Sequence, residues 1–90
     1  MNIADTNLQA AHKLAELAPR LGYAKARVLP DGSVAALGDL AFTRAIFTGL
    51  TETGWSARYC FANYCLADRR FAELQSEDDV PAGHTAVRFA

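Results

Sequence analysis

The sequence predicts an α+β fold, with an antiparallel β-sheet of about 4–5 strands and two helices in the order α-β-β-β-β-α-β. Three observations predict it. The stretch Phe42–Leu74 contains two β-rich runs around a Thr-Glu-Thr-Gly-Trp turn, followed at once by a short amphipathic segment. A first amphipathic segment opens the chain, and a short alternating run closes it. The 90 residues show no repeat or linker, so residues 1–90 form one small domain, with the helices packed mainly on one face of the sheet.

The first element is a helix over about residues 6–18. Asp5-Thr6-Asn7 supplies side chains that can accept hydrogen bonds from free backbone N–H groups at a helix start. Apolar residues then follow at helical spacing. Pro19 and Gly22 end the helix, because Pro lacks a backbone donor and Gly tolerates the left-handed conformation.

A first hairpin is predicted over residues 23–37. Tyr23–Leu29 alternates between two faces, as a half-buried strand does. Pro30-Asp31-Gly32 is a turn, since Pro presets one backbone angle and Gly accepts a positive φ. Ser33–Leu37 is the returning strand.

A second hairpin and the second helix follow. Phe42–Leu50 carries apolar residues on both faces, which favours a central strand, with Phe42, Ile46 and Leu50 expected on one face. Ala57–Asn63 returns, and Asn63 is the expected N-cap of a helix over Tyr64–Leu74. After an acidic loop, the alternating Thr85–Phe89 is the expected last strand.

The charge balance excludes simple electrostatic classes of protein. Lys and Arg total 9, and Asp and Glu total 10, for a net charge of −1. A generic nucleic-acid binder has a basic excess, and a DNA mimic has a large acidic one. The charge is uneven, however, because residues 71–83 hold four acids and no base. We interpret Glu77, Asp78 and Asp79 as partner-binding residues that steer a basic partner; the alternative is a solvated loop.

Two aromatic residues are further partner-binding candidates. Trp55 and Tyr59 lie in the second hairpin, and aromatic residues dominate the binding energy of many interfaces. Core packing is the alternative for both. An exposed edge strand could also pair two copies of the chain, so a homodimer stays open.

A nucleic-acid-binding module is the second hypothesis. Basic residues occur on several predicted strands, where they could form a basic, aromatic sheet face; they are Lys25, Arg27, Arg44 and Arg58. The α-β-β-β-α portion is similar to double-stranded-RNA-binding domains, but the second helix begins Asn63-Tyr64-Cys65-Leu66 instead of with a basic cluster.

The sequence contains no recognisable catalytic set. Cys60 and Cys65, with His12 and His84, match no familiar zinc spacing, and no glycine-rich phosphate loop is present. A Cys nucleophile with a His base remains a third, weaker hypothesis. We therefore expect no cofactor and no metal. Residues 1–10 lack a signal peptide pattern and no stretch is long and apolar enough for a membrane span, so we expect a cytoplasmic protein of a host cell.

The stretch Phe42–Leu74 resembles small phage and prophage proteins of no assigned function. They share the pattern FT-x-AI…GL-x-E-x-G-(aromatic)…R-(aromatic)-C-(aromatic), followed by an Ala-rich helix. This chain carries it as Phe42-Thr43, Ala45-Ile46, Gly49-Leu50, Glu52, Gly54-Trp55 and Arg58-Tyr59-Cys60-Phe61. The resemblance implies a phage origin. Small non-enzymatic proteins of that origin often bind and inhibit a host protein or ribonucleoprotein complex, as anti-CRISPR proteins do. We therefore expect this kind of interaction protein.

Overall fold

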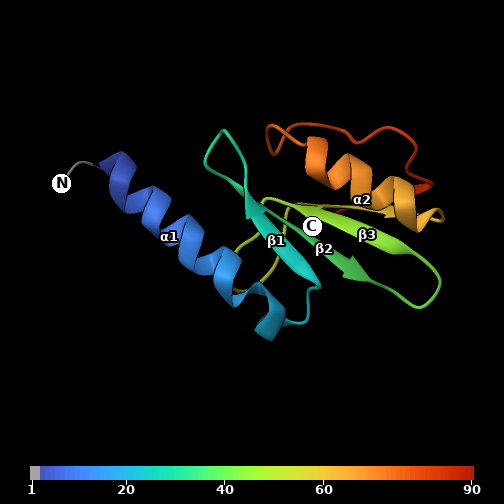
Figure 1. Cartoon of the computed structure of the whole chain (residues 1–90), viewed down its shortest axis with the longest axis horizontal. Helices are drawn as coiled ribbons and strands as arrows, with labels where there is room; N and C mark the ends of the chain where they lie inside the picture. The colour runs from blue at the N-terminus through green and yellow to red at the C-terminus, as the bar shows by residue number, and fades with distance from the viewer. Residues whose placement is uncertain (1–2) are drawn as a thin grey trace.

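The computed structural model describes residues 3–90, with side chains from Leu8 onward. Its helices and strands follow the predicted order, and the fold is α+β (Figure 1). The elements are α1 (Ile3–Leu17), the 3₁₀ turn η1 (Ala18–Leu21), β1 (Lys25–Val28), β2 (Val34–Asp39), β3 (Arg44–Thr48), β4 (Ala57–Phe61), α2 (Tyr64–Glu73) and β5 (Ala86–Phe89).

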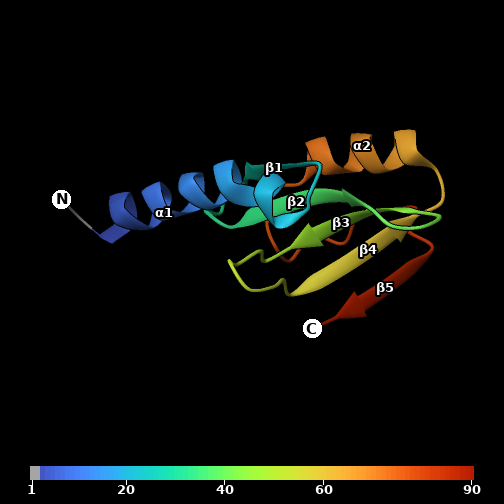
Figure 2. The same cartoon turned by 90° about the horizontal axis from the view of Figure 1, so that it is seen from below.

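The five strands form one antiparallel sheet in the order β1-β2-β3-β4-β5. Each strand pairs with the next strand of the chain, and this includes β4 and β5, although α2 and a loop lie between these two in the sequence (Figure 2). The register aligns Leu37, Ile46, Tyr59 and Val87 across β2 to β5, so these four residues share one face.

The first helix begins earlier than predicted. α1 starts at Ile3, so the expected cap cluster Asp5-Thr6-Asn7 lies within the helix; its side chains are outside the described ones. The predicted end is correct in kind. Pro19 sits in η1, and Gly22 closes it with φ of 102° in the left-handed region.

The two helices cover opposite faces of the sheet, which corrects the expectation that both pack on one face. α2 contacts β2, β3 and β4, whereas α1 contacts β1 and β2 from the other side (Figure 1). Side chains of a strand alternate between the two faces, so β2 contributes residues to a hydrophobic core on each face. Leu37 packs in the core under α2, and Ala36 packs in the core on the α1 side.

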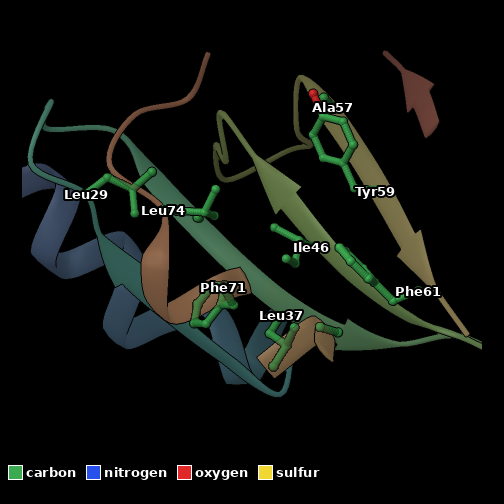
Figure 3. Packing of buried hydrophobic residues seen from close by; sticks show 10 residues of the cluster. Leu29, Leu37, Ile46, Ala57, Tyr59, Phe61, Phe71 and Leu74 are labelled. Carbon is green, nitrogen blue, oxygen red and sulfur yellow. The ribbon is translucent and has the colours of Figure 1, made fainter. Parts of the chain in front are cut away.

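The α2 core is the larger of the two and is drawn in Figure 3. Phe71 and Leu74 at the end of α2 pack with buried residues of the strands; those residues are Leu29, Ala35, Leu37, Ile46, Ala57, Tyr59 and Phe61. Asn63 caps the start of α2 as predicted, because its Oδ1 accepts a hydrogen bond from the Leu66 backbone N–H at 3.0 Å.

The α1 core contains an aromatic row. Tyr23 packs edge-on against Phe47 with ring centres 5.0 Å apart, and Phe47 packs edge-on against Trp55 at 5.6 Å. Small residues of α1 and η1, among them Ala11 and Ala18, fill the space next to the row. This core therefore combines one ring on β3, Phe47, and two rings from the segments next to β1 and β4 with small residues of the helix.

The predicted face of Phe42, Ile46 and Leu50 is wrong. Phe42 precedes β3 and is 89 % exposed. Leu50 packs in the α1 core, while Ile46 packs in the α2 core. Gly49 is the cause, because its φ of 63° interrupts the alternation between the two residues.

Candidate interaction site

The basic residues predicted for nucleic-acid binding do not form one surface. Lys25 and Arg27 share the α2 side of β1, but both are engaged by α2. Arg27 Nη1 donates to the carbonyl oxygens of Phe71 and Leu74 at 2.8 and 2.9 Å, at the end of the helix. Lys25 Nζ lies 5.7 Å from the centre of the Phe71 ring.

Arg44 and Arg58 lie on different faces. Arg44 Nε donates to Asp39 at 2.8 Å and its Nη1 donates to Asp68 at 2.6 Å, which raises the pKa of Arg44, the Asp39 hydrogen bond contributing most. Arg58 lies on the opposite face, beside Trp55. All four predicted residues thus make contacts within the fold, and they are divided between the two faces of the sheet.

The three acids of the loop after α2 have different roles. Asp79 closes the loop on itself, since its Oδ2 accepts from the backbone N–H groups of Gln75 and Ser76 at 2.8 and 3.2 Å. Glu77 and Asp78 are exposed, and neither carboxylate forms an ion pair with any described side chain. These two are therefore the acids available to a basic partner.

Asp31, in the turn between β1 and β2, ties the acidic loop to the sheet. Its Oδ2 accepts from the Glu77 backbone N–H at 3.0 Å, and its Oδ1 accepts from Ser33 Oγ at 2.6 Å. The Ser33 hydroxyl, and then the Glu77 N–H, lower the pKa of Asp31. Because folding lowers this pKa, the ionised Asp31 contributes its full stabilisation above its unfolded-state pKa. That contribution is lost as the pH falls through the folded-state pKa.

The two predicted aromatic anchors are separated by the sheet. Tyr59 is only 4 % exposed and packs edge-on against His84, with ring centres 5.2 Å apart, so it belongs to the core as the packing alternative stated. Trp55 is half-buried and belongs to the α1 core on the other face. Neither side chain is an exposed anchor of the kind predicted.

A hollow lies on the α2 side of the sheet, between β5 and the acidic loop, and we call it the edge hollow. Its volume is about 330 Å³. Thr48, Ala57 and Phe89 lie side by side in register across β3, β4 and β5 in its wall. The remaining lining residues are Ser56, Tyr59, Glu77, Asp78 and Val80. Three predicted partner-binding residues, Tyr59, Glu77 and Asp78, therefore meet in one place.

The rim of the edge hollow is apolar and exposed. Phe89 is 69 % exposed and Val80 is 63 % exposed, and Val87 beside them on β5 is 42 % exposed. No helix contacts β5 strongly, and Figure 2 shows the strand at the edge of the sheet farthest from both helices. The sequence predicts this strand but not its exposure, because Val87 and Phe89 occupy alternate positions, as the core-facing residues of a strand do.

A buried hydroxyl without a partner lies in the wall of the edge hollow. Thr48 is fully buried, and its Oγ1 has no hydrogen-bond partner among the described residues. Buried polar atoms are nearly always paired in folded proteins, because an unpaired one costs about 1–3 kcal/mol. This hydroxyl is therefore an unpaired donor and acceptor that lies behind the surface of the hollow.

Two arginines face each other on the opposite side of the sheet, and we call them the arginine pair. Arg58 on β4 and Arg88 on β5 are direct cross-strand partners. Neither forms an ion pair with a described side chain. The Arg58 guanidinium carbon lies 5.6 Å from the centre of the Trp55 ring.

Replacing Arg88 by Glu should stabilise the fold. Like charges directly opposite in a sheet destabilise it, and the change turns a repulsion into an attraction, so we expect the free energy of unfolding to rise by up to about 1 kcal/mol. Urea unfolding of Arg88→Glu and Arg88→Gln measures the change, with Gln expected to give a smaller gain. A loss of stability in both variants would contradict the repulsion.

The residues considered for catalysis are not brought together as a set. Cys60 belongs to the α1 core on one face, and the His84 ring packs on Tyr59 on the other. Cys65 is exposed at the start of α2. Among the side chains that the structure describes, from Leu8 onward, no three of the His, Cys, Asp and Glu types gather closely enough to hold a metal ion.

Comparison of the chain with models of known protein families, with curated proteins and with solved structures found no match. None of the helices in the described part of the chain has the length and apolar character needed to cross a membrane. Function is therefore inferred from the chain's own surfaces, and the edge hollow is the surface that combines exposed apolar groups, free acids and an unpaired hydroxyl.

Proposed function

We propose that this chain is a non-enzymatic interaction protein that uses the edge hollow to bind, and thereby inhibit, a protein or ribonucleoprotein complex of a host cell. The host and inhibitor parts of the proposal come from the resemblance of Phe42–Leu74 to phage and prophage proteins, with anti-CRISPR activity as the specific form. The choice of surface is supported by the exposed apolar residues and the acids around the edge hollow.

One observation carries the proposal: exposed apolar side chains and free carboxylates border the same hollow on an uncovered edge strand. Apolar groups at the centre of an interface supply most of its binding energy, while charges around them speed association and select the partner. Phe89, Val80 and Val87 fit the first role. Glu77 and Asp78 fit the second, because no described base neutralises them.

The same geometry favours a partner with an extended segment that carries a basic and an apolar side chain. β5 pairs with β4 on one side only, so its outer backbone N–H and C=O groups have no strand partner. An extended segment of the partner can add there as a sixth strand. One of its Lys or Arg side chains would reach Glu77 and Asp78, and one of its apolar side chains would fill the hollow beside Phe89.

The first test identifies the partner and compares two phenylalanines. A tagged chain is used to capture host proteins with and without nuclease, and the stoichiometric partner is identified by mass spectrometry. Phe89→Ser is expected to weaken binding of that partner at least about tenfold. Phe42→Ser is the matched control, since Phe42 is more exposed than Phe89 and lies outside the hollow. Equal loss in both variants would overturn the proposed surface.

The second test addresses the acids. Glu77→Gln with Asp78→Asn is expected to slow association roughly tenfold at low salt and to flatten its salt dependence. Glu16→Gln with Glu52→Gln removes the same charge from exposed positions outside the edge hollow and is the control. Asp79 is kept, because it closes its own loop. Unchanged affinity and salt dependence in the first double variant would show that the acids do not steer a partner.

A further inference from the structure

The face of β4 and β5 opposite the edge hollow holds the arginine pair, and we propose that this pair binds a doubly charged phosphate group. The site is independent of the edge hollow, because Arg58 and Arg88 project from the other side of the same strands. The main strand contacts of α1 are with β1 and β2, and Arg88 on β5 is exposed.

The arginine pair differs from the arginines that the fold uses internally. Arg27 donates to two carbonyl oxygens, Arg44 to two carboxylates, and Arg70 to Glu73 and a backbone oxygen. Arg58 and Arg88 have no such oxygen among the described side chains, although they lie directly opposite each other. Two arginines directly opposite each other on neighbouring strands, without a counter-charge, repel each other, and an anion bound by both relieves the repulsion.

Arg58 is held in place before any ligand arrives. Its guanidinium lies over Trp55, and Trp55 is itself fixed against Phe47 in the aromatic row. The Arg58 Nε atom is buried and has no hydrogen-bond partner. A positioned guanidinium loses little freedom on binding, which is why stacked arginines suit anion recognition.

The charge and shape of the site favour phosphate over carboxylate. A phosphate monoester carries close to two negative charges and three acceptor oxygens, so it can neutralise both guanidinium groups and accept from each. A carboxylate carries one charge and two oxygens. The ligand is therefore a terminal phosphate, whether free, on a nucleotide or at the 5′ end of a nucleic-acid strand.

The test is a titration followed by NMR, at constant ionic strength set with chloride. Inorganic phosphate is expected to shift the Nε–H signals of Arg58 and Arg88 and the Trp55 indole signal, with a dissociation constant of about 1 mM. Arg58→Gln and Arg88→Gln should each weaken binding about tenfold, the loss of one charge-assisted hydrogen bond. Arg69→Gln removes an exposed arginine of α2 and should leave binding unchanged.

The remaining arms distinguish the sources of phosphate. Adenosine monophosphate and a single-stranded oligonucleotide with a 5′-phosphate are compared with the same oligonucleotide ending in a hydroxyl. Tighter binding of the phosphorylated strand assigns the site to nucleic-acid ends, and equal binding of all phosphates assigns it to small molecules. Circular dichroism of each variant shows that the fold is retained. The proposal is overturned if phosphate shifts none of these signals, if Arg69→Gln weakens binding equally, or if a glutamate-rich peptide binds better than phosphate.

Discussion

Arg27→Met is expected to lower the free energy of unfolding by about 2–3 kcal/mol, because it removes two hydrogen bonds from a charged donor. Arg27 reaches from β1 to the last turn of α2, where it donates to the carbonyl oxygens of Phe71 and Leu74. The Phe71 oxygen also accepts a longer hydrogen bond, 3.4 Å, from the Leu74 backbone N–H, whereas Leu74 is the residue that caps the helix end. A cation at this end also interacts favourably with the helix dipole. Methionine keeps the apolar stem, so the change isolates the lost donors.

Lys25→Met is the matched control for this prediction. Lys25 lies on the same face of β1 but is exposed, and its Nζ lies 5.7 Å from the centre of the Phe71 ring. Its loss should cost about 0.5–1 kcal/mol. Urea unfolding measures both variants. Equal effects in the two would show that the Arg27 bonds contribute no more than a surface charge.

Gly49→Ala is expected to cost about 2–4 kcal/mol of stability, from backbone strain together with crowding. Gly49 has φ of 63°, a left-handed conformation that other residues adopt at a cost. An added Cβ would lie 2.7 Å from Ser56 Cβ, closer still to Ser56 Oγ, and 3.2 Å from Glu77 Oε2. The crowded atoms border the edge hollow, so the variant should also displace the acidic loop there.

Gly54→Ala provides the comparison within the same β3–β4 connection. Gly54 has no positive φ, and an added Cβ would meet nothing within 4 Å. Its stability should stay within about 0.5 kcal/mol of the unchanged chain, as expected for surface changes. Thermal and urea unfolding of the two variants check the contrast. A tolerated Gly49→Ala would mean that the loop can relax around the new methyl group.

The succession of elements could be predicted because local signals set it. The strand pairs follow from turn residues such as Pro30-Asp31-Gly32, and the start of α2 follows from the side chain of Asn63. The side that each helix covers could not be predicted, because both faces of β2 and β3 are apolar and either can receive a helix. The change of face between Ile46 and Leu50 could not be predicted either, because a residue pattern does not show that Gly49 takes a positive φ.

The acidic residues of the candidate site could be predicted from the sequence, but its exposed apolar residues could not. Glu77 and Asp78 stand out in the sequence as charges without bases nearby. Val80 and Phe89 look like ordinary core residues. They are exposed because the main contacts of α2 are with β2, β3 and β4, and neither helix packs strongly on β5. The arginine pair depends on the register of β5 against β4, which composition does not determine.

The uncovered position of β5 also has a consequence for local unfolding. Each of its residues is exposed, and the strand is held through its pairing with β4 and little buried apolar area. Segments of this kind open at a lower free energy than the centre of a sheet, so the amides of β5 should exchange with solvent before those of β2 and β3. Part of the binding free energy of any ligand on this strand is then spent on keeping it closed. Affinity for such a ligand would therefore rise with any change that lowers the opening frequency of β5, even one far from the bound groups.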